Sequence, residues 1–190
     1  MRKIVVSEFV TLDGVMEDPG GGDRTPHGGW SFKFGRSADQ QQFKTNELFA
    51  SDALLLGRVT YQGFAAAWPT MPGTGEYGER MNSLPKHVVS TTLETLDWNN
   101  SRPIKQNVAA EISKLKQQPG QDILVFGSGQ LVQTLMAHDL VDQYNLLVHP
   151  VVLGSGQRLF RDDAQAALKL VETKTFENGI VALVYQSDRK

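Results

Sequence analysis

The chain of 190 residues contains no cysteine. This excludes disulfide bonds and thiolate zinc sites, and it is typical of proteins from a reducing compartment, so we expect the cytoplasm. The four histidines are scattered along the chain and show no metal-ligand spacing: His27, His87, His138 and His149. The sequence therefore predicts no metal site.

Long apolar runs and an excess of one charge are also missing. After the basic start, the apolar run Ile4–Val6 stops at Ser7, which is short of the roughly 7 to 15 apolar residues of a secretory signal. No segment approaches the roughly 20 apolar residues that cross a bilayer. The 19 basic and 21 acidic side chains give a net charge of −2, so we expect neither a nucleic acid nor a membrane as partner.

The chain does contain alternating strand and helix patterns. Runs rich in β-branched residues predict strands, and apolar residues at helical spacing predict helices. Two further strand-like runs flank Asn178-Gly179, a strong hairpin signal. We expect strands at 3–11, 52–57, 86–91, 122–127, 144–154, 168–176 and 179–186, and helices at 37–50, 58–68, 107–120 and 130–140.

This order predicts one α/β domain over residues 1–190. Alternating strands and helices indicate a mostly parallel central sheet, and the closing hairpin adds an antiparallel edge. Right-handed crossovers place helices on both faces of such a sheet.

Two long segments without a regular pattern interrupt this order. Residues 11–36 hold seven of the 18 glycines together with Trp30, Phe32 and Phe34. A segment of this length is usually a functional loop or lid, and the aromatic residues favour that over a solvated insertion. Prolines and glycines between Pro69 and Gly78 mark a second loop.

Two predicted strands end in residues suited to phosphate. The strand at 52–57 ends at Gly57, and Arg58 and Thr60 follow in the first turn of a helix. Arginine at a helix N-terminus opposes the macrodipole unless an anionic ligand offsets it. The strand at 86–91 ends in Ser90 and Thr91, whose hydroxyls suit phosphate oxygens.

A third strand exit lies in the segment DILVFGSGQLVQTL, residues 122–135. Gly127 and Gly129 supply two glycines of the dinucleotide fingerprint G-x-G-x-x-G, but Val132 occupies the third position. Small residues here would let a pyrophosphate reach free N–H groups of the next helix. The same glycines would equally permit a tight turn. Because all three exits should line one crevice, we favour a dinucleotide site.

The motifs LLLGRVTY, LPKHVVST, VFGSGQLVQTL and DLVDQYNLLVHPVVLGSGQRLF, in this order, resemble the dihydrofolate reductase superfamily. The branch that they resemble holds the riboflavin-biosynthesis reductase C-terminal domain and its stand-alone bacterial relatives. TLDG at 11–14 is similar to the N-terminal signature of that branch. The resemblance covers nearly the whole chain and implies a dihydrofolate reductase-like three-layer sandwich and a homodimer.

The resemblance also implies NADPH at the carboxyl ends of the strands. The matching motifs would place the cofactor phosphates at the first two exits, the pyrophosphate and nicotinamide at the third, and the substrate beside the signature at 11–14. Trp30 is a candidate wall of the substrate pocket, although core packing explains it as well. The implied cofactor residues are Gly57, Arg58, Thr60, Ser90, Thr91, Gly127, Ser128, Gly129, Gln130 and Leu131, and the implied substrate residues are Asp13 and Gly14.

The sequence departs from its relatives in two places. Dihydrofolate reductases carry a carboxylate on their first helix beneath the pterin ring, where both Asp39 and Gln41 fit the spacing here. Riboflavin enzymes usually add a zinc deaminase domain with cysteine ligands, which this chain lacks. Asp13, Glu17 and Asp39 are the candidate proton donors.

We therefore expect an NADPH-dependent reductase that transfers hydride to a small heterocyclic, imine or carbonyl substrate. Aminouracil-ribosyl compounds, as in 5-amino-6-(5-phosphoribosylamino)uracil reductase, and pterin-like compounds are the leading substrate classes. The alternative is a non-catalytic, nucleotide- or metabolite-binding homodimer of the same fold.

Overall fold

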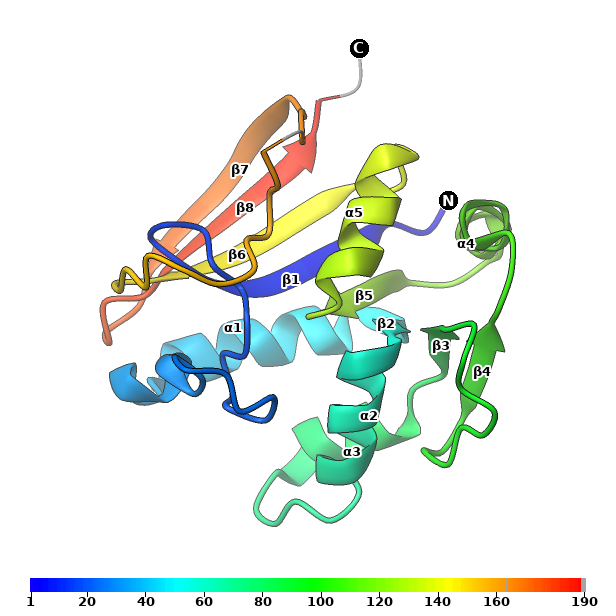
Figure 1. Cartoon of the computed structure of the whole chain (residues 1–190), viewed down its shortest axis with the longest axis horizontal. Helices are drawn as coiled ribbons and strands as arrows, with labels where there is room; N and C mark the ends of the chain where they lie inside the picture. The colour runs from blue at the N-terminus through cyan, green and yellow to red at the C-terminus, as the bar shows by residue number, and fades with distance from the viewer. Residues whose placement is uncertain (163, 189–190) are drawn as a thin grey trace.

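The computed structural model describes residues 1–162 and 164–188, and its centre is one eight-stranded sheet (Figure 1). The strand order across the sheet is β4-β3-β2-β5-β1-β6-β8-β7. The strands are β1 (Ile4–Thr11), β2 (Ser51–Gly57), β3 (Lys86–Val89), β4 (Ser101–Ile104), β5 (Asp122–Phe126), β6 (Gln143–His149), β7 (Leu168–Thr175) and β8 (Val181–Ser187).

The first six strands of this order run parallel, and only the C-terminal hairpin introduces antiparallel pairs. β8 pairs antiparallel with β6 and with β7. The turn between β7 and β8 contains Gly179 with φ of 81°, the left-handed conformation that an Asn-Gly turn supplies. The predicted sheet and its C-terminal hairpin are confirmed.

Helices cover both faces of the sheet because the parallel strands are apolar on both sides. In β2, Leu55 packs into the cluster with α4 and α5, whereas Leu54 and Leu56 pack into the cluster with α1, α2 and α3. Burying each such side chain contributes about 1.5–3 kcal/mol. The helices are α1 (Ala38–Phe49), α2 (Arg58–Ala67), α3 (Gly75–Ser83), α4 (Val108–Gln117) and α5 (Gly129–Ala137), with a 3-10 helix, η1 (Trp30–Phe34).

The connections place a topological switch point between β1 and β5. The chain leaves β1 toward α1 on one face and leaves β5 toward α5 on the other (Figure 1). The crevice outside the carboxyl ends of such strands is where open α/β sheets bind ligands. The pairing of β1 with β5 ends at Ser7 opposite Phe126, so the rest of β1 extends beyond its neighbour at this point.

Three predictions of secondary structure were wrong. Part of the expected loop 69–78 belongs to α3, where glycine signals masked the apolar pair Tyr77 and Met81, which joins the core. β4 was not predicted because it has four residues and contains Pro103; an edge strand tolerates the missing N–H. β6 ends at His149, and the chain beyond it forms a loop rather than more strand.

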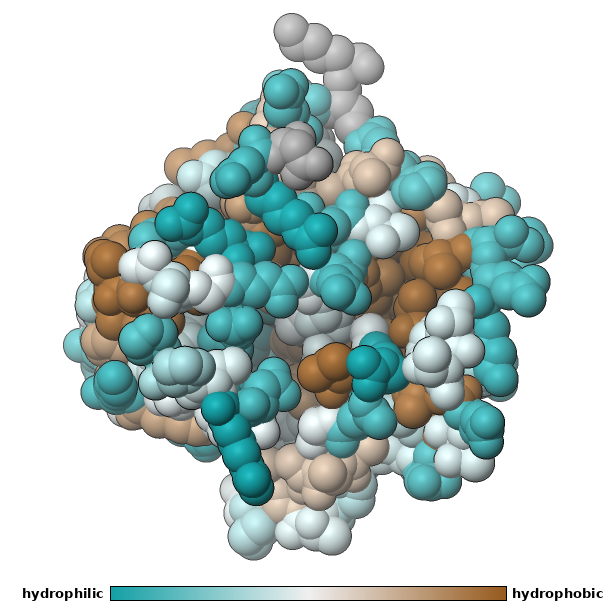
Figure 2. All heavy atoms as spheres, in the orientation of Figure 1, coloured by the Kyte–Doolittle hydropathy of each residue, from teal (hydrophilic) through white to brown (hydrophobic). Residues whose placement is uncertain are grey.

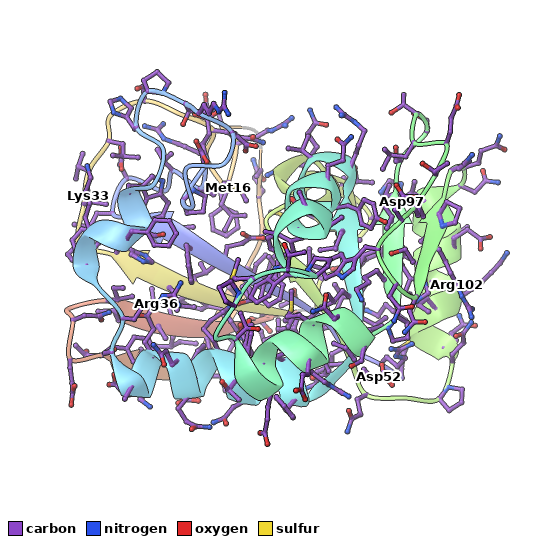
Figure 3. All side chains as sticks on the ribbon, turned by 90° about the horizontal axis from the view of Figure 1, so that it is seen from below. Met16, Lys33, Arg36, Asp52, Asp97 and Arg102 are labelled. Carbon is purple, nitrogen blue, oxygen red and sulfur yellow. The ribbon has the colours of Figure 1, made fainter. Side chains whose placement is uncertain are left out.

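The loop after β1 is structured. The carboxylate of Asp18 accepts hydrogen bonds from the N–H groups of Asp23 and Thr25, each at 3.0 Å. Backbone hydrogen bonds join this loop to the one after β6, including Met16 N–H to Gln157 O at 2.9 Å. Figure 3 places Met16 toward the middle of the molecule and Lys33 at its edge. The loop thus has internal hydrogen bonds and backbone contacts with its neighbour, and its tip around Gly22, Asp23 and Arg24 is exposed.

Candidate functional site

The carboxyl ends of β2 and β5 are joined by the hydroxyl of Ser128. Gly57 N–H donates to Ser128 Oγ at 2.8 Å, and Ser128 Oγ donates to Phe126 O at 2.9 Å. Ser128 N–H in turn donates to Thr60 Oγ1, in the first turn of α2, at 2.9 Å. The two strand-to-helix junctions singled out in the sequence are therefore one rigid unit.

This unit holds two consecutive residues in the left-handed region, Gly127 with φ of 53° and Ser128 with φ of 64°. For a non-glycine residue this conformation costs about 1–3 kcal/mol, and such strain clusters at functional sites. A Cβ on Gly127 would lie 2.8 Å from Thr60 Oγ1. Glycine at 127 is therefore required by the turn itself, whether or not a ligand binds.

The first turn of α5 presents backbone donors. A helix leaves its first N–H groups without intrahelical partners, and within residues 1–162 and 164–188 no other group accepts from those of Gly129, Gln130 and Leu131. These donors and the positive end of the helix dipole favour an anion. Over Gly129 the structure is close-packed, because a Cβ there would lie 2.7 Å from Gln157 Nε2 and 3.1 Å from Met16 Sδ.

Arg58, Ser90 and Thr91 lie at neighbouring strand exits. Arg58 is exposed in the first turn of α2 and donates to Gln62 Oε1 at 3.0 Å. Val89 is opposite Gly57 in the β2–β3 register, so Ser90 and Thr91 follow directly beside the Gly57 exit. The Ser90 hydroxyl accepts from the N–H of Thr92 at 3.2 Å and of Leu93 at 3.0 Å, and Thr91 is exposed.

Figure 2 shows the surface of the molecule in the orientation of Figure 1. It is hollowed near its centre, and both hydrophilic and hydrophobic side chains border the hollow (Figure 2). The first two residues of α2, Arg58 and Val59, are both exposed. The predicted cofactor residues thus lie on adjacent junctions at one end of the sheet.

Asp13 has a role different from the predicted proton donor. Its carboxylate accepts from Thr11 Oγ1 at 2.6 Å and from the N–H groups of Leu153 at 3.2 Å and Gly154 at 2.7 Å. These bonds, the Thr11 hydroxyl first, lower the pKa of Asp13 to about 2. At neutral pH the group carries no proton to donate. Asp13 ties the loop after β1 to the loop after β6, and Gly14 O accepts from Leu159 N–H in the same contact.

Trp30 and Asp39 are not brought to the crevice as predicted. Trp30 is fully buried, donates from Nε1 to Glu17 O at 2.8 Å and meets the His149 ring edge-on at 5.0 Å, so it is core and not a pocket wall. The carboxylate of Asp39 accepts from Gln40 N–H at the start of its own helix. The buried residue there is Gln40, which binds Asn178 at 2.7 Å.

Sequence reasoning missed Glu8, a carboxyl group at the switch point. The residue is 4% exposed, and its Oε2 accepts from Gly127 N–H at 3.0 Å. Oε1 has no hydrogen-bond partner in the part of the chain that the structure describes. Burial raises the pKa of Glu8 well above its ordinary value, and Lys44 and the Gly127 N–H oppose this. Leaving a buried polar atom unpaired costs about 1–3 kcal/mol.

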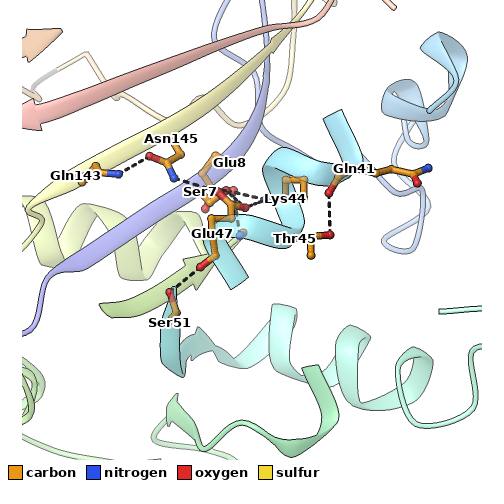
Figure 4. Close-up of polar contacts among 10 residues, drawn as sticks. Ser7, Glu8, Gln41, Lys44, Thr45, Glu47, Ser51, Gln143 and Asn145 are labelled. Atoms are coloured by element: carbon orange, nitrogen blue, oxygen red, sulfur yellow. Dashed lines mark hydrogen bonds and ion pairs between the residues drawn. The ribbon is translucent and has the colours of Figure 1, made fainter. Parts of the chain in front are cut away.

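Glu8 adjoins a buried polar cluster between α1 and the sheet (Figure 4). Lys44 forms an ion pair with Glu47 and donates to Ser7 Oγ at 2.7 Å. Ser7 Oγ is 2.8 Å from Glu47 Oε1, and Asn145 Nδ2 donates to Glu47 Oε2 at 3.0 Å. The ammonium group of Lys44 lies 4.4 Å from the centre of the Phe126 ring, at the end of β5.

A signal for this cluster exists in the sequence. Ser7 and Glu8 interrupt the apolar run of a strand that is buried on both faces. On α1, Gln40, Lys44 and Glu47 recur at helical spacing beside the buried Leu48, so polar residues occupy the side of the helix that faces the sheet. Polar residues in the buried strand β1 and on the sheet-facing side of α1 together indicate a buried polar network between the two elements.

Residues 1–162 and 164–188 contain no group of three or more His, Cys, Asp and Glu side chains arranged to hold a metal ion. In the same ranges, no helix combines the length and the apolar character needed to span a bilayer.

The chain matches a known family over most of its length. The family model described as the RibD C-terminal domain matches residues 2–182. The uncharacterized protein YyaP of Bacillus subtilis (strain 168) is 35% identical over 188 residues, which cover 97% of this chain and 94% of YyaP.

Solved structures share the fold at low identity. A protein assigned to riboflavin biosynthesis in Shewanella sp. PV-4 has a TM-score of 0.78 at 18% identity, over 98% of this chain and 99% of its own. Dihydrofolate reductase of Enterococcus faecalis, solved with NADP(H), has a TM-score of 0.64 at 12% identity, over 98% and 97%.

A bifunctional enzyme also matches, over 98% of this chain but only 56% of its own. It is the diaminohydroxyphosphoribosylaminopyrimidine deaminase/5-amino-6-(5-phosphoribosylamino)uracil reductase of Thermotoga maritima, with a TM-score of 0.62 at 15% identity. Together these matches confirm the dihydrofolate reductase-like sandwich, and their number includes reductases. The chain belongs to the RibD C-terminal domain family.

Proposed function

We propose that the protein is an NADPH-dependent reductase of a small heterocyclic, imine or carbonyl substrate. The observation that carries this proposal is the rigid unit formed by the β2 and β5 exits. Through Ser128 it fixes two strand-to-helix junctions side by side, and among residues 1–162 and 164–188 the first-turn N–H groups of α5 have no partner. Free N–H groups at a helix N-terminus favour an anion such as a pyrophosphate, which supports the proposal.

The residues at these exits fit the cofactor. Gly129, Gln130 and Leu131 would hold the pyrophosphate through their N–H groups, and Arg58 and Thr60 would approach the phosphates from α2. Ser90 and Thr91, beside Gly57 in the sheet, would lie near the 2′-phosphate that distinguishes NADPH from NADH. An anionic group here also relieves the unfavourable position of Arg58 at a helix N-terminus.

The bound cofactor would supply a hydride, and the protein would position and shield the reacting atoms. The two covering loops, joined through Met16 and Gln157, lie over the first turn of α5 and would restrict water. Asp13 maintains this cover by binding Leu153 and Gly154.

The name of one structural neighbour supports the proposed substrate class. The Thermotoga maritima enzyme is named as a reductase of 5-amino-6-(5-phosphoribosylamino)uracil. We therefore place aminouracil-ribosyl compounds first and pterin-like compounds second.

Binding of NADPH and NADH, followed by protein fluorescence, tests the proposal. Arg58→Ala should weaken NADPH binding about tenfold, which corresponds to about 1.4 kcal/mol. Arg102→Ala is the matched control, because Arg102 is an exposed arginine on the edge strand β4. Equal weakening by both variants would contradict a site at the Arg58 helix. Tight NADPH binding without turnover of any candidate substrate would favour the non-catalytic alternative.

The homodimer also stays a proposal. The edge strand β7 exposes the apolar side chains of Leu170 and Val171 at 49% and 53%, a surface on which a second copy would pair. Light scattering of the Leu170→Lys/Val171→Glu variant should give a monomer mass where the wild type gives a dimer. A monomeric wild type at micromolar concentration would refute this proposal.

A further inference from the structure

We infer that Glu8 is the proton donor of this site, presenting Oε1–H to the substrate at the switch point between β1 and β5. The inference rests on the proposed reductase function and adds the acid that hydride transfer to C=N or C=O requires. It replaces Asp13 and Asp39, which the structure engages elsewhere.

The position of Glu8 comes from the register of β1. Ser7 is the last residue of β1 opposite β5, and Glu8 follows it, opposite Leu146 of β6 on its other side. After Phe126, the last residue of β5, the backbone turns away from β1 at Gly127. The N–H of Gly127 donates a hydrogen bond to Glu8 Oε2. The carboxyl group is thus fixed at the turn proposed to hold the cofactor.

The two oxygens of Glu8 have different surroundings. Oε2 is engaged by Gly127, whereas Oε1 is buried and has no partner among the described residues. Buried polar groups are nearly always hydrogen-bonded, so an unpartnered one indicates a place completed by a ligand or water. At the switch point of the sheet, a substrate nitrogen or oxygen would complete it.

The surrounding charges suit a group that holds a proton and then releases it. Lys44 and Glu47 of α1 act on Glu8 through their charges, and the Gly127 N–H acts on it through a hydrogen bond. Burial and Glu47 favour the neutral acid, whereas Lys44 and the Gly127 N–H stabilise the carboxylate that remains after proton transfer. Lys44 is itself held by Ser7 and Glu47.

The proton balance is complete with the proposed cofactor as reductant. The substrate carbon of C=N gains a hydride from the dihydronicotinamide, the nitrogen gains the proton from Glu8 Oε1, and the products are the amine, NADP⁺ and a Glu8 carboxylate. Water then returns a proton to Glu8. With a carbonyl substrate, the oxygen takes the place of the nitrogen.

The test compares Glu8→Gln with Glu8→Asp and with the control Glu111→Gln, an exposed glutamate on α4. Glutamine retains an acceptor for Gly127 N–H but has no acidic proton. With NADPH and 5-amino-6-(5-phosphoribosylamino)uracil as probe, we expect Glu8→Gln to lower kcat about 10²–10⁴-fold while changing the Kd for NADPH less than twofold. Glu111→Gln should leave both unchanged.

The pH profile separates a proton donor from a structural residue. Wild-type kcat should be high while Glu8 is protonated and fall as the pH rises through its pKa. Glu8→Asp should retain a pH-dependent rate, and Glu8→Gln should give a low rate without this limb. If Glu8→Gln and Glu111→Gln have equal kcat and both bind NADPH normally, the role of Glu8 is overturned, whereas the proposed reductase function is not.

Infrared difference spectra of protein labelled with ¹³C-glutamate give a readout that needs no turnover. We expect a protonated-carboxyl band at pH 7 that is absent in Glu8→Gln and shifts when NADPH binds. No such band, or a band unchanged by bound NADPH, would overturn the inference even if the probe is not reduced. Failure of NADPH to bind the wild type would instead reject the proposed function, and the role of Glu8 with it.

Discussion

Removal of Lys44 is the perturbation whose effect can be worked out most fully from the structure. The side chains of Lys44 and Glu47 are only 14% and 6% exposed, and they form an ion pair with Ser7 beside them. Lys44→Met keeps the length and the apolar stem of the side chain but leaves the Glu47 carboxylate buried without its counter-ion. Breaking a buried pair in this way costs about 3–5 kcal/mol.

The expected loss lies at the lower end of this range, about 3 kcal/mol, because Glu47 retains its contacts with Ser7 and Asn145. In a domain of this size 1 kcal/mol corresponds to roughly 2–4 °C in Tm. The Tm of Lys44→Met should therefore fall by about 6–12 °C. Urea unfolding followed by circular dichroism measures the free energy, and thermal scans measure the Tm.

Two comparisons identify the cause. Lys114→Met removes an exposed lysine that pairs with Glu111, and exposed pairs contribute about 0–1 kcal/mol. The double variant Lys44→Met/Glu47→Gln removes the stranded charge as well and should be more stable than Lys44→Met alone. A loss below about 1 kcal/mol for Lys44→Met, or a double variant less stable than the single one, would refute the reasoning.

Three further predictions concern the crevice. Gly127→Ala should lower stability by about 1–3 kcal/mol in urea unfolding, because residue 127 has positive φ and a Cβ would meet Thr60; wild-type stability would show that the turn can relax. Because burial raises the pKa of Glu8, wild type should lose stability relative to Glu8→Gln as pH rises above the unfolded-state value near 4.5; parallel stability curves would contradict this. The pKa of Asp13 is lowered to about 2, so the difference between wild type and Asp13→Asn should be present above pH 4 and shrink as pH falls toward 2; a constant difference would contradict it.

Much of the fold is predictable from the sequence because strands that are buried on both faces of the sheet have continuous apolar runs. In β2 the four consecutive residues 53–56 are all apolar and buried, a continuous run that separates such a strand from the amphipathic helices around it. The Asn178-Gly179 turn specifies the hairpin locally. α3 escapes prediction because its glycines carry a local turn signal that tertiary packing overrides. β4 escapes prediction because it has four residues and contains Pro103.

The candidate site is only partly predictable. Glycines and hydroxyls at strand exits mark Gly57, Thr60 and Gly127 from local chemistry, and the sheet brings these together at one end. The polar cluster of Ser7, Lys44, Glu47 and Asn145 forms because one face of α1 packs against one side of β1. No local sequence motif predicts this tertiary contact. For the same reason, the burial of Trp30 and the engagement of Asp13 by Leu153 and Gly154 are visible only in the structure.

The most direct test of the central claim is a fluorescence titration of the wild-type protein with NADPH, with Arg58→Ala and Arg102→Ala in parallel. The account predicts saturable NADPH binding that Arg58→Ala weakens about tenfold and Arg102→Ala leaves unchanged. Absence of saturable binding to the wild type would contradict it, because the strand exits joined by Ser128 would then form a turn and not a cofactor site.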